Sequence, residues 1–176
     1  MIRPATPADI PQVSAIYEEI LTNEEQTRSY TNWVRGVYPT AETARNALKE
    51  GWLYVLEEDG LILATAILNH VQLPEYKDIP WQYPGQGDEI FVIHTLCVPP
   101  SRSGRGLARQ FVAFAEDLAA QKGCTALRLD TYEGNLPAAG LYTKLGWRYA
   151  GSAHFLFQGA IPEVLKCFEK QTALSV

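Results

Sequence analysis

The segment that decides how this sequence folds is Val98-Pro-Pro-Ser-Arg-Ser-Gly-Arg-Gly-Leu-Ala108. It follows an apolar run from Glu89 to Val98 that is typical of a strand buried on both faces. It precedes residues 107–122, whose apolar side chains recur at helical spacing, and Gly123 suits the left-handed position that ends a helix. A second apolar run, Thr125 to Thr131, comes next. The pattern predicts a βαβ unit with parallel strands and a right-handed crossover.

This glycine-bearing loop is suited to binding phosphate through its main chain. The first N–H groups of a helix have no partner inside the helix and point outward beside the positive end of its dipole. Gly104 and Gly106 let the backbone approach an anion, and Arg102, Arg105 and Arg109 add positive charge. The alternative is a simple turn with solvated arginines. Spacing excludes a P-loop, which needs Lys before Ser or Thr, and a dinucleotide fingerprint, whose third small position is Arg109.

A second motif is Asn135-Leu-Pro-Ala-Ala-Gly-Leu-Tyr-Thr-Lys-Leu-Gly-Trp147. Asn135 is a good N-cap, Pro137 is tolerated in a first turn, and Gly146 can end the helix. Tyr142 follows Asn135 by two helical turns, which places both near one face. Tyr142 is therefore either a functional residue or a core residue that packs with its leucine neighbours.

Together, in this order and at this spacing, the motifs resemble those of the GNAT superfamily of acetyl-CoA-dependent N-acetyltransferases. The family's loop reads Gln/Arg-x-x-Gly-x-Gly/Ala, five residues past the valine that closes the fourth strand, and falls here on Ser103 to Ala108, with Val98 as the valine. The family's motif Asn-x-x-Ala-x-x-x-Tyr-x-Lys-Leu-Gly-aromatic falls on residues 135–147. The opening from Ile2 to Asp9 is also typical of the family. One departure is Ser103, which stands where the family has Gln or Arg.

The resemblance implies the fold. It is the α/β (α+β) GNAT acyl-CoA N-acyltransferase fold, with a twisted, mixed, mostly antiparallel sheet of about six or seven strands and about four flanking helices. One parallel pair of strands is splayed around acetyl-CoA. We expect residues 1–176 to form a single N-acetyltransferase domain.

The remaining patterns predict elements that fit this fold. Thr6, Pro7 and Asp9 signal the start of a helix with an apolar stripe. Asp59-Gly60 predicts a hairpin turn. The other predicted elements are a helix over 40–50 that ends at Gly51, strands over 52–56 and 61–68, and a final antiparallel pair over 148–157 and 164–168.

The resemblance also implies the chemistry. The pyrophosphate of acetyl-CoA binds the loop, the pantetheine and thioester contact main-chain groups of the fourth strand, and an acceptor amine attacks the thioester directly in a ternary complex. Tyr142 donates to the departing thiolate. The residues expected to bind acetyl-CoA are Leu96, Val98, Ser103, Gly104, Arg105, Gly106, Leu107, Ala108, Arg109, Asn135, Ala138 and Tyr142.

The acceptor amine must also lose a proton before it can attack the thioester. An alkyl ammonium has a pKa of about 10.4, so exposing its lone pair at neutral pH costs about 4–5 kcal/mol. His94 is the best-placed side chain on the fourth strand and is the first candidate for the catalytic base. Glu89 and a water ordered by backbone carbonyls are the alternatives, and a histidine in a strand is also often a hydrogen-bonded core residue.

Composition limits the class of protein. The chain has 47% hydrophobic residues, enough for one well-packed domain, and its net charge of −5 argues against broad binding of nucleic acid or anionic membranes. No apolar run approaches the ~18 residues of a membrane span. Cys97, Cys124 and Cys167 lack metal-ligand spacing, so we expect no metal, free thiols and a reducing cytoplasm.

Two other features leave alternatives open. The connection from His70 to Asp88 contains Tyr76, Trp81 and Tyr83, and it is either a flap over a ligand or a satellite hydrophobic cluster. Glutamates cluster where the first helix ends, and they either attract a cationic amine or form a solvated helix end; they are Glu18, Glu19, Glu24 and Glu25.

We expect the acceptor to be a primary amine of a small molecule and the enzyme to be a monomer or a homodimer. The alternatives are a protein or peptide N-acetyltransferase, a non-catalytic acetyl-CoA-binding module, and a nucleotide-binding βαβ protein.

Overall fold

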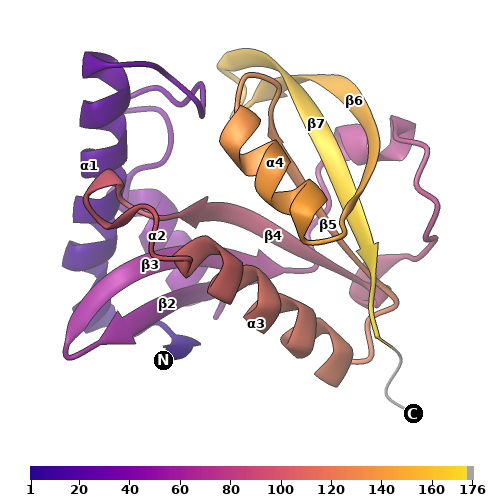
Figure 1. The fold of residues 1–176 in the computed structure, drawn as a ribbon, viewed down its shortest axis with the longest axis horizontal. Coiled ribbons are helices and arrows are strands. Elements are labelled where there is room, and N and C mark those ends of the chain that lie inside the picture. Colours follow the sequence, from indigo (N-terminus) through magenta and orange to yellow (C-terminus); the bar gives the residue numbers. More distant parts are fainter. Residues whose placement is uncertain (174–176) are drawn as a thin grey trace. The chain divides into compact units, whose positions relative to one another are not determined.

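The computed structural model describes residues 1–173, and they divide into two compact units (Figure 1). The first unit comprises Met1–Ser29, Trp33–Leu68 and His94–Phe114. The second comprises Tyr30–Asn32, Asn69–Ile93 and the described chain from Ala115 onward. Strand β4 (Ile90–Cys97) and helix α3 (Leu107–Gln121) each contribute residues to both units.

The first unit contains three strands, and each pair of neighbouring strands is antiparallel. They are β1 (Ile2–Pro4), β2 (Leu53–Glu58) and β3 (Leu61–Asn69). β1 pairs with β2, and β2 pairs with β3. Asp59 and Gly60 have φ of +50° and +78°, as a primed hairpin turn requires, so the predicted hairpin is confirmed.

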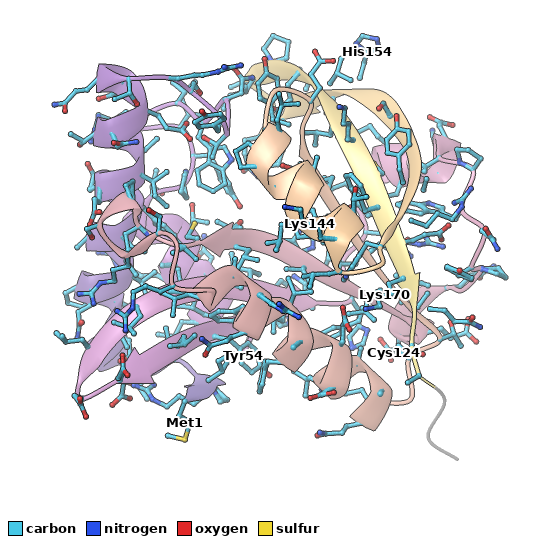
Figure 2. The ribbon with its side chains drawn as sticks, viewed as in Figure 1. Met1, Tyr54, Cys124, Lys144, His154 and Lys170 are labelled. Atoms are coloured by element: carbon cyan, nitrogen blue, oxygen red, sulfur yellow. The ribbon has the colours of Figure 1, made fainter. Side chains whose placement is uncertain are left out.

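Two helices, α1 (Ile10–Gln26) and α2 (Ala41–Lys49), bury one face each in the core of the first unit. The predicted stripe of α1 is buried except for Ile10, which is partly buried. Thr40 caps α2, since its hydroxyl accepts a hydrogen bond from the N–H of Thr43 at 3.3 Å. The ring of Tyr54 on β2 packs against Phe114 of α3, with 5.7 Å between centroids (Figure 2).

The opening segment is held by ion pairs between its own residues. The Arg3 guanidinium donates to both Asp9 carboxylate oxygens, at 2.8 and 3.0 Å, and the N–H of Thr6 donates to the same carboxylate at 2.7 Å. The Arg3 cation and these hydrogen bonds lower the pKa of Asp9 to about 2. The opening from Ile2 to Asp9 therefore comprises strand β1 and the 3-10 turn Pro7–Asp9, which leads into α1.

The second unit contains a sheet of four strands with one parallel pair. β4 begins parallel to β5 (Ala126–Tyr132), in register from Ile90–Ala126 to Ile93–Leu129. β7 (Ile161–Gln171) lies between β5 and β6 (Arg148–Phe157) and is antiparallel to both. Helix α4 (Leu136–Lys144) covers one face of these strands (Figure 1), and Lys170 of β7 (Figure 2) donates to the carbonyl of Leu145 just after it.

The strand order is β1-β2-β3-β4-β5-β7-β6. The structure therefore has a seven-stranded, mostly antiparallel sheet with one parallel pair and four α-helices, which confirms the predicted fold class. β6 has the predicted bounds, but β7 is longer than the predicted strand over 164–168. The prediction was too short because the charged residues Glu163 and Glu169 occupy buried positions of β7 and interrupt its apolar pattern.

The long connection between β3 and β4 forms a hydrophobic cluster. Tyr76 and Ile79 are buried, and Trp81 and Tyr83 pack with them against β4 and β5. The Trp81 indole N–H donates to the carbonyl of Tyr76 at 2.8 Å, and the Arg128 guanidinium lies 4.2 Å from its ring centroid. The cluster alternative is therefore the one that the structure supports, and the aromatic side chains stabilise the second unit.

A buried carboxylate fixes this connection to β7. Glu169 is fully buried and accepts hydrogen bonds from the N–H groups of Gln82 and Tyr83 at 2.8 and 3.1 Å. Its charge is balanced by an ion pair with Arg148. Arg128 reaches the same region and donates to the carbonyl of Tyr83 at 3.0 Å.

Candidate active site

The loop before α3 offers a continuous run of free main-chain donors. Gly104 and Gly106 have φ of +76° and +73°, and residues 103–106 are exposed. The N–H of Gln110 donates to the carbonyl of Gly106, which is the first helical hydrogen bond. Within residues 1–173, the N–H groups from Gly104 to Arg109 donate to no protein acceptor. This run at the start of a 15-residue helix fits an anion with several oxygens, such as a pyrophosphate.

The side chains of the loop contribute less than its main chain. Arg105 forms an exposed ion pair with Glu58 at 3.0 Å, so part of its charge is already balanced. Ser103 is exposed, and its N–H is used inside the loop by the carbonyl of Pro100. Arg102 and Arg109 take part in no ion pair within the described chain. They remain able to add positive charge.

We expect Gly106→Val to weaken acetyl-CoA binding more than Ser103→Ala. Valine at a φ of +73° is strained by about 1–2 kcal/mol, so the loop would change its conformation and lose the run of donors. A Cβ at Gly106 meets no atom within 4 Å, so the effect comes from the backbone and not from a clash. Titration calorimetry with acetyl-CoA measures both dissociation constants. A larger loss for Ser103→Ala would contradict a cradle made of main-chain amides.

The end of β4 contains a residue with an unusual backbone, Thr95, whose φ is +50°. Left-handed conformation costs a threonine about 1–3 kcal/mol, so it persists only where the surroundings enforce it. The buried Tyr38 shares a hydrogen bond between its hydroxyl and that of Thr95. The main chain of β4 therefore departs from regular strand geometry between His94 and Leu96, which are partly buried, as is Val98.

Glu89 lies at the opposite end of β4. Its carboxylate accepts a hydrogen bond from the N–H of Gln86 at 2.9 Å, and its side chain is exposed. Glu89 belongs to the second unit, whereas His94 belongs to the first, and Glu89 stays an alternative to His94 as the catalytic base.

Helix α4 begins and ends as predicted. The Asn135 side-chain oxygen accepts from the N–H of Ala138 at 3.2 Å, which confirms Asn135 as the cap. Its amide group keeps its N–H donors for other partners. Gly146 has a φ of +81° and follows the end of the helix.

Tyr142 is buried, with 7% of its surface exposed. Its ring lies 6.0 Å from the ring of Trp147 and 5.8 Å from that of Phe168. The core-packing role considered for Tyr142 is thus present. These contacts also hold the ring in one orientation, which a proton donor needs.

Two of the four glutamates at the end of α1, Glu18 and Glu25, share one cation, Arg35. A hollow of about 370 Å³ is lined by Glu18, Glu19, Thr22, Asn23, Gln26 and Pro100. Arg35 bridges Glu18 and Glu25, and Glu19 accepts from the N–H of Ser101 at 2.7 Å. The solvated helix end is therefore the alternative that the structure favours.

Two carboxylates of the second unit were not expected as functional residues. Asp130 of β5 accepts a hydrogen bond from the Tyr76 hydroxyl at 2.7 Å, and Glu163 of β7 accepts one from the Asn32 side-chain amide at 3.2 Å. Burial raises the pKa of Asp130 to about 6 and that of Glu163 to about 7. The signal in the sequence was an acidic residue within each of two apolar strands.

Replacing Asp130 with Asn should make stability less dependent on pH. The pKa of Asp130 is raised to about 6 on folding, so its contribution to stability is full below its ordinary value of 3.8 and is lost as the pH rises through 6. Chemical unfolding between about pH 4 and pH 8 should show a shallower decline for Asp130→Asn than for the unmodified chain. An identical slope would show that Asp130 titrates normally.

Two kinds of site are absent from the described residues. Within residues 1–173, no group of three or more His, Cys, Asp or Glu side chains is arranged to hold a metal ion. No helix in that range combines the length and apolar character that crossing a membrane requires.

The chain matches the model of the acetyltransferase (GNAT) family over residues 12–147, more than half of its length. Streptothricin acetyltransferase from Streptomyces lavendulae is 31% identical over 76 residues, which cover 43% of this chain and 40% of that relative. The match therefore spans about two fifths of the relative's length.

Solved structures share the fold. A GNAT-family acetyltransferase from Streptococcus agalactiae has a TM-score of 0.81 at 24% identity. The match covers 98% of this chain and 95% of that chain. The protein yncA from Salmonella typhimurium, a putative acetyltransferase solved with its cofactor acetyl-CoA, has a TM-score of 0.69 at 16% identity. The match covers 100% of this chain and 95% of that chain. The chain belongs to the acetyltransferase (GNAT) family.

Proposed function

We propose that this enzyme transfers the acetyl group of acetyl-CoA to a primary amine of a small molecule, by direct attack in a ternary complex. The observation that carries the proposal is the run of N–H groups from Gly104 to Arg109, which have no acceptor among residues 1–173. Hydrogen bonds to charged oxygens contribute about 1.5–3 kcal/mol each, so several such donors support specific binding of a pyrophosphate. The chain acts in this proposal as a single N-acetyltransferase domain.

Other residues bind the remainder of acetyl-CoA in this proposal. Main-chain groups of Leu96 and Val98 hydrogen-bond the thioester end and the pantetheine, and the strained Thr95, which directly precedes Leu96, sets their direction. The free amide donors of Asn135 contact the pantetheine. Ala138 leaves room beside it, and Ser103, Arg102 and Arg109 contribute at the periphery of the loop.

The reaction needs one group to accept a proton and one to donate it. His94 takes a proton from the zwitterionic tetrahedral intermediate, to which an unperturbed imidazole with a pKa near 6.5 is suited, and Glu89 or a water ordered by backbone carbonyls is the alternative. Tyr142 donates to the departing thiolate. A phenol of pKa about 10 and a thiol of pKa about 8.5 make full transfer mildly uphill, so the hydrogen bond forms first and the proton moves late.

The name of the Streptomyces relative makes streptothricin the first acceptor to test. The alternatives are a protein or peptide acceptor and a non-catalytic acetyl-CoA-binding module. We also propose a monomer or homodimer that binds no nucleic acid. A reducing compartment such as the cytoplasm is proposed because Cys97, Cys124 and Cys167 are all buried free thiols.

Thiol release from acetyl-CoA tests the proposal. The panel contains streptothricin, spermidine, an arylalkylamine and a peptide with a free N-terminus, and thermal shift with acetyl-CoA runs beside it. We expect acetyl-CoA to stabilise the protein and at least one small amine to release thiol at a rate that saturates. Release with the peptide alone would favour a protein acceptor, and stabilisation without release would favour a binding module.

A further inference from the structure

We propose that Tyr38 is a positioning residue for acetyl transfer: its hydroxyl holds Thr95 in the left-handed conformation and so fixes the direction of the main chain at Leu96. This role rests on the proposed function, in which main-chain groups of Leu96 bind the thioester end of acetyl-CoA. Tyr38 touches neither substrate in this role and acts through the end of β4. All the residues that carry the argument belong to the first unit.

The first argument is the backbone of Thr95. Its φ of +50° is unusual for a β-branched residue, and such a conformation persists only where its surroundings enforce it. Pairing with β5 does not enforce it, because the parallel register of the two strands ends at Ile93. The backbone of Thr95 sets the plane of the next peptide, which carries the N–H of Leu96. The unusual conformation therefore lies directly before the main chain that the thioester needs.

The second argument is the partner of the Thr95 side chain. The hydroxyl of Thr95 shares a hydrogen bond with the hydroxyl of Tyr38, which is 57 residues away in the chain. Tyr38 is only 7% exposed, so little water competes for this bond. Within residues 1–173, the Thr95 side chain has no other hydrogen-bond partner. The hydroxyl of Tyr38 is therefore the group that enforces the conformation of Thr95.

The third argument is the rigidity of the segment that carries Tyr38. The N–H of Tyr38 donates to the carbonyl of Val34 at 3.0 Å, which closes a tight turn. Arg35 ties this turn to α1, since its guanidinium donates to the carboxylate of Glu25 at 2.9 and 3.0 Å. The ring of Trp33 packs edge-on against the ring of Tyr38, with 5.8 Å between centroids. A side chain that is itself held in this way can maintain a strained neighbour.

A second buried tyrosine in the same core, Tyr17 of α1, has no such role. Tyr17 is 1% exposed, and burial raises its pKa well above the usual value, with smaller contributions from the nearby Cys97 and Tyr38. Its hydroxyl has no hydrogen-bond partner within residues 1–173. Tyr17 therefore packs beside Tyr38 without holding Thr95, which makes it the matched control.

The consequence for the reaction concerns geometry and not proton transfer. With the hydroxyl of Tyr38 in place, the main chain at Leu96 is oriented for the thioester before acetyl-CoA binds. Without this hydroxyl, Thr95 relaxes toward the extended conformation that threonine prefers in strands, and the N–H of Leu96 turns with it. A small misplacement of a binding group slows turnover. The loop from Gly104 to Arg109 is built from its own main chain, so it still binds the pyrophosphate.

Tyr38→Phe tests this role, with Tyr17→Phe as the control. With streptothricin, or with the small amine that turns over, we expect Tyr38→Phe to lower kcat about tenfold, because one shielded hydrogen bond holds the strained main chain. The dissociation constant for coenzyme A, measured by titration calorimetry, should stay within about twofold, and Tyr17→Phe should match the unmodified enzyme in both quantities. In Tyr38→Phe, the carbon chemical shifts of Thr95 should move from left-handed values toward those of a strand.

Substitutions at Thr95 separate positioning from a general loss of packing. Thr95→Val removes the same hydrogen bond from its other end and leaves the Tyr38 ring intact, so it also serves if Tyr38→Phe is too unstable to assay. Its loss in kcat should equal that of Tyr38→Phe, and the double variant should be no slower than either. Glycine adopts a positive φ without strain, so in the Thr95→Gly background Tyr38→Phe should cost less than about twofold. An equal, tenfold cost in both backgrounds would indicate lost packing and overturn the role.

Three further outcomes would also contradict the role of Tyr38. If the unmodified enzyme turns over and Tyr38→Phe keeps its kcat, the role is wrong and the acetyltransferase proposal stands. If Tyr38→Phe is slower but the chemical shifts of Thr95 do not move, the hydroxyl does not act through Thr95. If the unmodified enzyme releases no thiol with any amine, the proposed function fails and the positioning role fails with it.

Discussion

Tyr142→Phe is expected to lower kcat at least tenfold while acetyl-CoA still binds. The phenylalanine ring keeps the contacts with Trp147 and Phe168, at 6.0 and 5.8 Å between centroids, so the fold around α4 is preserved. Only the hydroxyl is lost, and with it the donor proposed to stabilise the departing thiolate. General acid assistance of this kind is worth ~10²–10⁴ in rate, so a tenfold loss is a conservative expectation.

Tyr149→Phe is the matched control. Tyr149 also packs on Phe168, at 5.7 Å, but it is half exposed and its hydroxyl bonds to Ser152. Steady-state thiol release gives kcat for both variants, and titration calorimetry gives the dissociation constant for acetyl-CoA. Equal turnover of Tyr142→Phe and the unmodified enzyme, with a verified acceptor, would remove Tyr142 from the mechanism.

Glu169→Ala should cost about 3–5 kcal/mol of stability, since it breaks a buried ion pair and leaves its partners unsatisfied. The carboxylate is fully buried, and its loss would free the N–H groups of Gln82 and Tyr83 and the guanidinium of Arg148. The connection that carries Tyr76 and Trp81 would then lose its anchor to β7. Urea unfolding, followed by tryptophan fluorescence, measures the change in the free energy of unfolding.

Glu169→Gln and Glu133→Ala bracket this effect. Glutamine keeps the shape and one oxygen acceptor, so its cost should be intermediate, whereas exposed Glu133 should change stability by less than about 0.5 kcal/mol. A cost for Glu169→Ala that equals the cost for Glu133→Ala would show that the β3–β4 connection is held by its aromatic side chains alone.

Much of the fold could be predicted because local chemistry and tertiary packing agree. Asp59-Gly60 specifies a hairpin turn by its backbone preferences, and Asn135 and Gly146 bound α4 by capping. β1 was missed because three residues carry too short a pattern, and β7 was shortened because Glu163 and Glu169 break its apolar periodicity.

The loop of the candidate site could be predicted from the sequence because its shape depends on the backbone preferences of its glycines. Gly104 and Gly106 are the residues that favour positive φ, and the loop adopts it. Thr95 was unpredictable, since threonine prefers regular strands and its left-handed conformation is accompanied by a hydrogen bond with Tyr38, distant in the chain. The partners of Asp130 and Glu163 are equally distant in sequence, so only the folded chain shows the environment that changes their acidity.

The most direct test of the account is the mass of the acceptor after incubation with the enzyme and acetyl-CoA, measured together with thiol release. The account predicts that a small amine from the panel gains the mass of one acetyl group in step with the thiol released, and that Tyr142→Phe slows both. Thiol release without an acetylated acceptor, or no release from any amine while acetyl-CoA binds, would contradict transfer to an amine.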